Sequence, residues 1–302
     1  MRGGGARAYV FLLAAVAAIW GASFLFIKVA DRAMRPVFVV ELRMTIAALT
    51  LLPFLLAARG RLAWGDLRSV ARLGAVLGVF NTVLPFTLIT WGETHIDSGV
   101  AAIGNASTPI WVALVAIPFL PSERASGIKL VGICVGLVGV GVLAGATPGA
   151  GLWEILGTLA VILASFLYGA ANIYLQPRFP TGREVALVTA SMVWGAAILL
   201  PFAIFQAPSH LPGWKPVGSV VALGAGGTSL ALLLYYRMLR EYGSARAILV
   251  TYLLPVTALF YGVGLLGEPL HASELIGLAL ILCGVALGSG LVRSARRAAP
   301  AA

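Results

Sequence analysis

The sequence contains two copies of one long pattern, and this duplication limits the folds that are open to the chain. Ile19-Trp20-Gly21-Ala22 recurs as Leu167-Tyr168-Gly169-Ala170, 148 residues later, and Leu51-Leu52-Pro53 recurs as Leu199-Leu200-Pro201 at the same offset. Further matches follow along both copies, with an offset that stays between 145 and 150 residues. One register with small gaps therefore relates the two halves of the chain.

Each copy holds five long apolar segments, and each segment approaches the roughly 20 residues that a helix needs to cross a hydrocarbon core of about 30 Å. We place the first repeat at residues 1–150 and the second at residues 151–302. The sequence therefore predicts an all-α, polytopic membrane protein with ten transmembrane helices. The expected spans are residues 8–30, 36–58, 69–91, 96–119, 126–146, 152–175, 184–206, 217–238, 244–266 and 272–292.

The number of spans in each copy is odd, so the second copy has to enter the membrane from the side opposite to the first. Two inverted five-helix repeats are typical of secondary transporters, whose substrate site lies near the bilayer midplane between the repeats. The short connections between spans leave no room for a soluble domain. We therefore expect the lipid bilayer and a small-molecule substrate as the partners of this chain.

Composition agrees with a membrane location. The chain has 302 residues, of which 60% are hydrophobic and 11% are charged, and its mean hydropathy is +0.98. So few polar groups cannot cover a soluble globule of this size. Residues 8–30 are too long for the apolar region of a signal peptide, and we interpret them as a retained first helix.

The net charge of +10 suggests nucleic-acid binding, but the positions of the charges argue against it. With the N-terminus inside, sixteen Lys and Arg residues fall in cytoplasmic segments, Arg43 falls within a span, and four lie on the other face, namely Lys28, Arg32, Arg35 and Lys215. Short cytoplasmic loops carry such an excess of basic residues. The pattern predicts a multi-pass protein with both termini cytoplasmic, and the alanine and glycine content suggests a bacterial cytoplasmic membrane.

Several kinds of chemistry have no motif in the sequence. The chain lacks a Gly-x-x-x-x-Gly-Lys-Ser/Thr phosphate loop, a Gly-x-Ser-x-Gly motif and a His-Glu-x-x-His motif. Cys134 and Cys283 stand alone, without a partner at metal-ligand spacing. We therefore predict no enzymatic activity, no catalytic residue, no cofactor and no metal site.

Glu41 and Arg43 are the opposite charges that lie well inside one expected span. The two residues lie roughly 8 and 10 Å along the helix that begins at Pro36, and their side chains project from it in nearly opposite directions. Each therefore needs a partner on another element or a wet cavity. Arg43 either links to a neighbouring helix end or meets a substrate carboxylate, and Glu41 is a candidate for proton or cation coupling. Their counterparts in the second repeat are Thr189 and Ser191.

Aromatic and amide side chains occur at depths where lipid-facing residues are apolar. Trp20 and its repeat mate Tyr168 lie close to mid-membrane, away from the interfaces that such rings favour, so they either pack in the core or form the wall of a polar cavity. A buried amide costs several kcal/mol unless it is hydrogen-bonded, which favours the cavity. The amides in question are Asn81, Asn105 and Asn172.

Two prolines interrupt equivalent spans of the repeats. Proline frees a backbone carbonyl one turn earlier and kinks a helix. Trp111 lies beside Pro109, and Tyr252 lies beside Pro255. We predict that these two kinked helices, together with Trp20, Tyr168 and Arg43, line the substrate site.

The fifth and tenth spans contain Gly132-x-x-x-Gly136 and Gly284-x-x-x-Gly288. Small residues four apart let membrane helices approach closely. The motifs serve packing within one chain or dimerisation, and we expect a monomer or a weak homodimer.

These features resemble the ten-helix, EamA-type exporters of the drug/metabolite transporter superfamily, and within that group the bacterial aromatic amino acid exporters. The resemblance covers nearly the whole chain. It rests on Ile19-Trp20-Gly21-Ala22-Ser23-Phe24, on Arg43 followed by Ile46-Ala47-Ala48, on Ser98-x-x-Ala101 leading to Pro109, and on Ser244-x-x-Ala247, Leu254-Pro255-Val256 and Leu266-Gly267-Glu268-Pro269. It implies a helical basket of two inverted halves that opens alternately to each side and exports amino acids or related small amphiphiles, driven by a gradient. For Glu123 and Glu268, near a membrane surface, we expect a structural role at a helix start.

Three functions remain open from the residues. The first is export of neutral or aromatic amino acids, with cationic drugs or quaternary ammonium compounds as an alternative substrate that would bind the rings of Trp20 or Trp111. The second is exchange of sugar phosphates or nucleotide sugars, which would require several buried basic groups. The third is a channel or a membrane scaffold, although pseudo-symmetry within one chain favours alternating access.

Overall fold

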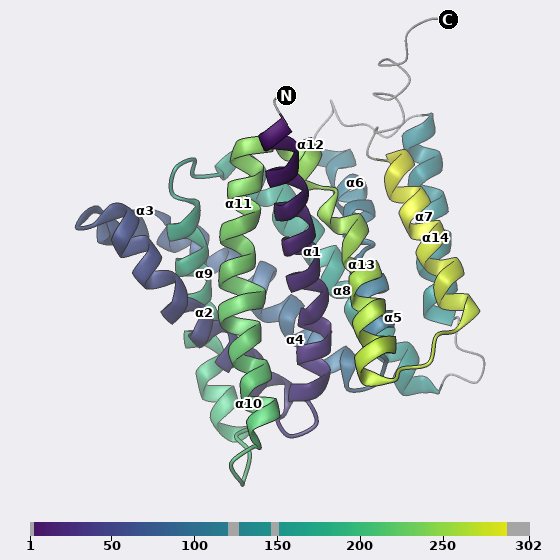
Figure 1. Ribbon diagram of the computed structural model, residues 1–302, viewed down its shortest axis with the longest axis horizontal. Helices are drawn as coiled ribbons and strands as arrows, with labels where there is room; N and C mark the ends of the chain where they lie inside the picture. Colours follow the sequence, from purple (N-terminus) through teal and green to yellow (C-terminus); the bar gives the residue numbers. More distant parts are fainter. Residues whose placement is uncertain (1–2, 120–126, 146–150, 289–302) are drawn as a thin grey trace, which may run out of the picture.

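The computed structural model describes residues 3–119, 127–145 and 151–288, and every regular element in these ranges is helical (Figure 1). The helices are α1 (Gly3–Ala30), α2 (Pro36–Arg59), α3 (Leu62–Leu77), α4 (Leu84–Glu93), α5 (Ser98–Asn105), α6 (Thr108–Phe119), α7 (Ile128–Gly145), α8 (Leu152–Leu175), α9 (Glu184–Phe205), α10 (Trp214–Val221), α11 (Ala231–Tyr242), α12 (Ser244–Ala247), α13 (Val250–Tyr261) and α14 (Ala272–Gly288).

Several of these helices join into single spans. A π-helical stretch over Gly78–Val83 connects α3 to α4, a second over Ala222–Leu230 connects α10 to α11, and a third over Gly262–Leu266 extends α13. Seven helical segments within the described residues are long and apolar enough to cross a membrane, and three shorter apolar ones are Ile128–Ala144, Val250–Leu266 and Ala272–Gly288. The ten expected helical spans and the all-α fold class are confirmed.

The third span begins earlier than the sequence predicts. The expected start was residue 69, but the helix begins at Leu62. Its second turn holds the charged residues Asp66 and Arg68, and the charge of Asp66 is neutralised locally because its carboxylate accepts a 2.6 Å hydrogen bond from the Arg59 guanidinium at the end of α2. An amphipathic helix start is therefore stable here, although hydropathy excludes it from the apolar run.

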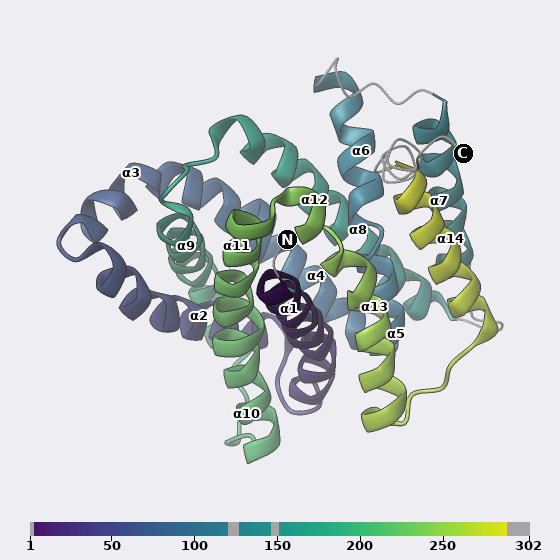
Figure 2. The same ribbon diagram turned by 45° about the horizontal axis from the view of Figure 1, so that its top comes forward.

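Each main contact between helices of different repeats has an equivalent contact in which the first and second repeats are interchanged. α1 packs against α13 as α8 packs against α6, and α4 packs against α8 as α11 packs against α1. α2 packs against α9, and α7 packs against α14 at one end of the molecule (Figures 1 and 2). A two-fold axis between the repeats produces this pattern. Because each repeat crosses the membrane five times, the repeats are inverted.

The same symmetry is visible at single residues. A Cβ atom added to Gly21 on α1 would collide with Thr257 on α13, and one added to Gly169 on α8 would lie 3.0 Å from Trp111 Cβ on α6. Gly21 and Gly169 are repeat mates, and so are Thr257 and Trp111 in the register of the two prolines. Glycine is therefore required at both positions because a helix from the other repeat approaches closely.

The glycine motifs of the fifth and tenth spans pack against each other within the chain. A Cβ atom added to Gly284 on α14 would lie 2.5 Å from Gly136 Cα on α7, and one added to Gly132 would lie 2.7 Å from the Gly284 carbonyl oxygen. Packing within one chain, the first of the two interpretations of these motifs, is confirmed. Cys134 and Cys283, on the same helices, are exposed free thiols.

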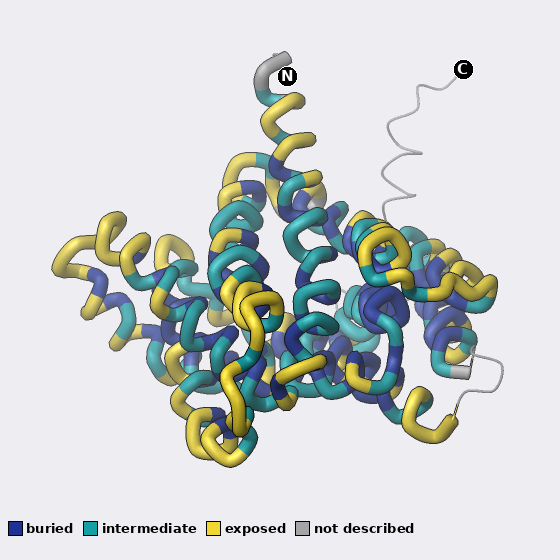
Figure 3. Tube along the Cα trace, turned by 60° about the horizontal axis from the view of Figure 1, so that its bottom comes forward, coloured by how far each residue is buried: buried dark blue, intermediate teal, exposed yellow. Residues whose placement is uncertain are grey.

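The surface is apolar, as lipid requires. Large side chains such as Phe205, Phe260 and Phe11 are 85%, 71% and 71% exposed. The buried residues lie toward the middle of the bundle (Figure 3), and they include hydroxyls such as Thr228 and Ser165 together with the charged groups Arg43 and Glu93. Polar groups thus concentrate inside, where helices of the two repeats meet.

Candidate functional site

Arg43 is buried where α2 meets the second repeat. Its Nε atom donates a 2.9 Å hydrogen bond to Thr228 Oγ1, in the π-helical stretch Ala222–Leu230, and its guanidinium lies 3.9 Å from the centre of the Phe86 ring on α4. A glycine permits this approach, because a Cβ atom added to Gly224 would lie 2.9 Å from the Arg43 carbonyl oxygen. Among the residues that the structure covers, no carboxylate lies within salt-bridge distance of Arg43. Its charge is therefore held by a neutral hydroxyl and a ring.

Glu41 lies on the same helix but does not pair with Arg43, as its spacing predicts. It is buried, and its Oε1 atom accepts a 2.7 Å hydrogen bond from Thr45 Oγ1, one turn later on α2. The coupling role of Glu41 stays a prediction, because this contact is local to one helix.

The four aromatic side chains predicted to bind substrate pack against one apolar cluster. Trp20, Trp111, Tyr168 and Tyr252 are half-buried and contact the same core, which contains Ile103. The Trp20 ring lies 5.2 Å from that of Tyr235 on α11, and Tyr168 is close enough to Arg43 to interact with its charge. Helices of both repeats thus bring these aromatic side chains to one core.

The three amides have different environments. The Oδ1 atom of Asn105, at the end of α5, is buried and has no hydrogen-bond partner among the described residues. Asn81 is half-buried in the π-helical stretch Gly78–Val83. Asn172 is exposed and donates a 2.9 Å hydrogen bond to the Tyr168 carbonyl. Asn105 is therefore the amide whose burial most calls for a ligand.

The two prolines have different positions in their spans. Pro109 is the second residue of α6, after a break at Ala106 and Ser107, and a proline is tolerated there because its missing N–H falls in the first turn. Pro255 lies inside α13, while that span is broken earlier, at Ile248 and Leu249. The two spans are therefore both interrupted, but at positions that the repeat register does not predict.

A buried acidic cluster was missed by the sequence analysis. Glu93, at the last turn of α4, is 0% exposed, so Glu41 is joined by a second buried acidic side chain on a membrane-spanning helix. Both carboxylate oxygens of Glu93 and both of Asp31 are buried and have no hydrogen-bond partner in the part of the chain that the structure describes. The sequence signal was weak, because Glu93 follows the expected end of its span at residue 91.

Lys28 anchors this cluster. Its Nζ atom donates hydrogen bonds of 2.7 Å to the Glu93 carbonyl oxygen and 2.6 Å to the Ile96 carbonyl oxygen. Asp31 follows α1 in the connection to α2, and burial raises the pKa of its carboxyl to about 8, against the opposing effect of the Lys28 charge. Burial also raises the pKa of Asp97, which precedes α5. The Asp31 carboxyl group is therefore largely neutral near physiological pH.

Glu268 has a structural role at a helix start, as expected, but the helix belongs to the other repeat. Its carboxylate accepts hydrogen bonds from the backbone N–H of Ser98 at 3.0 Å, from Ser98 Oγ at 2.7 Å and from the Gly99 N–H at 3.3 Å. These are the free donors of the first turn of α5. Glu123, its repeat mate, lies outside the described residues.

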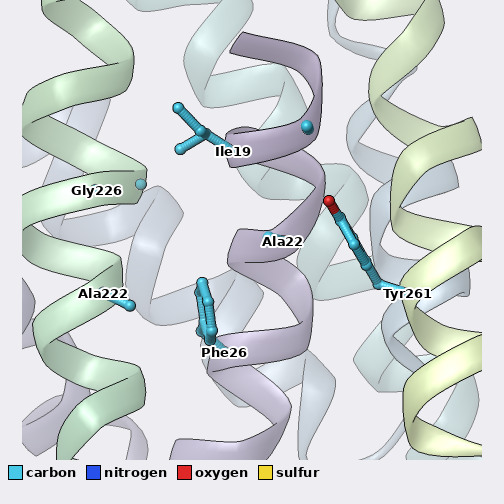
Figure 4. A pocket seen from close by; sticks show the side chains of 8 residues that line it. Ile19, Ala22, Phe26, Ala222, Gly226 and Tyr261 are labelled. Atoms are coloured by element: carbon cyan, nitrogen blue, oxygen red, sulfur yellow. The ribbon is translucent and has the colours of Figure 1, made fainter. Parts of the chain in front are cut away.

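Two apolar pockets lie elsewhere on the bundle. One of about 300 Å³ opens along α1 (Figure 4), and it is lined by Ala18, Ile19, Ala22, Phe26, Ala222, Gly226, Gly227 and Tyr261. A second of about 410 Å³ lies between α2, α3 and α9. Neither is lined by a residue predicted to bind substrate, so the predicted lining stays a prediction.

The sequence profile of the EamA-like transporter family matches residues 7–145 and 155–290, one match in each half of the chain. The chain belongs to the EamA-like transporter family. It is thus a membrane transporter, and the resemblance drawn from the Trp20 and Arg43 motifs is confirmed.

Two relatives that match this EamA-like chain over most of their own length have names that describe transport. A protein of Archaeoglobus fulgidus named "Uncharacterized transporter" is 30% identical over 91% of this chain and 96% of its own. A protein of Salmonella typhimurium named "Probable amino-acid metabolite efflux pump" is 26% identical over 91% of this chain and 92% of its own. A solved crystal structure matches 95% of this chain and 98% of its own with a TM-score of 0.64, and at 21% identity it shows the fold alone.

Proposed function

We propose that the protein is a secondary transporter that exports small amphiphilic metabolites, chiefly aromatic and neutral amino acids, across the cytoplasmic membrane by alternating access. The observation that carries this proposal is Arg43. A buried guanidinium without a carboxylate partner is costly unless a counter-charge arrives. A substrate carboxylate supplies that charge, and the planar fork of arginine suits it.

The aromatic core supports the choice of side chain. Trp20, Trp111, Tyr168 and Tyr252 contact one cluster, and aromatic pairs add about 0.5–1.5 kcal/mol beyond the area that they bury. A substrate with a ring and a carboxylate would use both the cluster and Arg43. The relative named as an amino-acid metabolite efflux pump supports the same class of substrate.

The alternatives fit the site less well. Sugar phosphates and nucleotide sugars need several buried basic groups, and Lys28 is already engaged by two backbone carbonyls. A cationic drug would be repelled by Arg43, although the rings would attract it. Substrates of these classes belong in the same assay as competitors.

The test is counterflow in proteoliposomes. Vesicles loaded with unlabelled phenylalanine should take up radiolabelled phenylalanine with saturation, and leucine should compete less well. Trp20→Ala and Tyr168→Ala should each raise the apparent KM by roughly two- to tenfold, because they remove a stacking partner worth about 0.5–1.5 kcal/mol.

Trp214→Ala is the matched control, because Trp214 is 80% exposed at the start of α10, and it should leave the apparent KM unchanged. If wild-type vesicles exchange none of the amino acids but exchange a sugar phosphate or a quaternary ammonium compound, the proposed substrate class is wrong.

A further inference from the structure

Glu93 is an ionisable group with no structural task for its side chain. It is 0% exposed at the C-terminal turn of α4, and neither carboxylate oxygen has a hydrogen-bond partner within the described residues. Lys28 fixes this turn through the backbone, because it binds the Glu93 carbonyl oxygen and not the carboxylate. Buried carboxylates without partners are expensive inside a membrane protein and mark ion or substrate pathways.

The charged groups around Glu93 come from three neighbouring elements and from the cluster at the end of the bundle. Lys28 of α1, Arg43 of α2 and Asp31 of the α1–α2 connection all act on its charge, as does Glu268 after α13. From α8, which packs against α4, Tyr168 interacts with the charge of Arg43. From the start of α5, Asp97 acts on Glu268 and Lys28. Glu93 thus interacts with two basic groups, Lys28 and Arg43, and with two acidic groups, Asp31 and Glu268.

The arrangement matches the two charges of an amino acid. Arg43 has no carboxylate within salt-bridge distance among the described residues, and Glu93 interacts with its charge from a second helix. A zwitterion placed between them would neutralise both buried charges. Building on the proposed function, we propose that Glu93 binds the substrate ammonium group and a proton in turn, so that one must leave before the other binds.

This exclusion couples export to a proton gradient. With the cluster facing outward, as the charge distribution predicts, an external proton converts the Glu93 carboxylate to a carboxylic acid, and the ammonium group loses its counter-charge and leaves. After the return step the proton leaves Glu93 to the cytoplasm, and the carboxylate accepts the next ammonium group. Asp31, whose carboxyl has a raised pKa, lies where it can pass the proton inward.

Glu93 fits this role better than Glu41, the earlier candidate. Glu41 already accepts a hydrogen bond from Thr45 on its own helix, whereas Glu93 has no partner among the described residues. Protonation of Glu93 would also remove a negative charge that acts on Arg43. Proton binding at Glu93 and carboxylate binding at Arg43 would therefore influence each other.

The first test measures protons released on substrate binding. Purified protein in weakly buffered detergent solution, at a pH near neutral, is mixed with phenylalanine, and a pH indicator reports the release. Wild type should release a proton, and Glu93→Gln should release none. In proteoliposomes the same variant should raise the apparent KM for phenylalanine roughly tenfold or more, the loss expected when a charged partner is removed. Its counterflow should no longer depend on pH.

Wild-type protein provides a second test that needs no folded variant. N-acetylphenylalanine keeps the ring and carboxylate but lacks the ammonium group, so it should bind poorly and release no proton. Glu154→Gln, at the exposed first turn of α8, is the matched control and should behave as wild type.

The outcomes separate this inference from the proposed function. The role of Glu93 is overturned if the Glu93→Gln variant still releases a proton, or if only the Glu41→Gln variant fails to release one. In either case, counterflow by the wild-type protein would still support amino acid transport. Equal transport of phenylalanine and N-acetylphenylalanine would also overturn the role of Glu93. Wild-type vesicles without amino acid counterflow would contradict the proposed function itself, and the inference with it.

Discussion

At the scale of single residues, the main feature is Arg43, a buried charged side chain without an ion pair among the described residues. Arg43 is stabilised by the Thr228 hydroxyl and the Phe86 ring, which leaves its charge available to a ligand. The repeat mate of Arg43 is Ser191, so the charge occurs in one half only. A symmetric scaffold therefore carries this buried charge in one repeat alone.

Asp31 gives a prediction about pH and stability. Its pKa is raised from 3.8 to about 8 in the folded protein, chiefly by burial. The folded state therefore holds a proton that the unfolded state has lost, and stability falls as pH rises through this window. We expect the Tm in detergent to fall between pH 4 and about 8, with each kcal/mol worth roughly 2–4 °C.

Asp31→Asn removes the titrating group and should flatten this dependence. The measurement is Tm against pH by a thiol-independent dye or by circular dichroism, with Glu154→Gln as the control. A Tm that rises with pH across the same window, or an unchanged slope in Asp31→Asn, would contradict the assignment.

At the scale of elements, close helix approach is set by glycine. On α7, a Cβ atom added to Gly139 would lie 2.8 Å from both the Ile281 backbone nitrogen and Leu280 Cβ on α14, whereas one added to Gly141 meets nothing within 4 Å. The two glycines are two residues apart on one helix. They therefore separate the effect of packing from that of helix propensity.

Gly139→Ala should destabilise the protein by about 1–3 kcal/mol, the usual cost of overpacking. Gly141→Ala should be neutral or slightly stabilising, because alanine is favoured over glycine inside a helix by about 1 kcal/mol. Thermal unfolding in detergent measures both. Equal Tm values for the two variants would show that α7 and α14 do not pack as described.

Most element positions follow from the sequence, because lipid requires long apolar runs. Span α2 was expected at residues 36–58 and extends over Pro36–Arg59. The polar start of α3 was missed because Asp66 is neutralised by Arg59 and by Arg183 of the other repeat. Arg43 was found because it interrupts an apolar run, whereas Glu93 was missed because its burial depends on neighbours distant in sequence.

At the scale of the whole molecule, polar contacts join the two repeats near both ends of the bundle. At the end expected to be cytoplasmic, Arg183 lies 3.3 Å from Asp66, which also pairs with Arg59. At the other end, the Glu268 carboxylate caps α5. Alternating access requires that one set of contacts opens while the other holds, and both sets consist of a few polar contacts.

The measurement that tests export most directly uses inverted membrane vesicles, whose interior corresponds to the cell exterior. With respiration making the interior acidic, vesicles containing the wild-type protein should accumulate radiolabelled phenylalanine, a protonophore should abolish the accumulation, and Glu93→Gln vesicles should not accumulate it. Vesicles that accumulate no amino acid, or whose accumulation survives the protonophore and the Glu93→Gln change, would contradict a proton-coupled amino acid exporter.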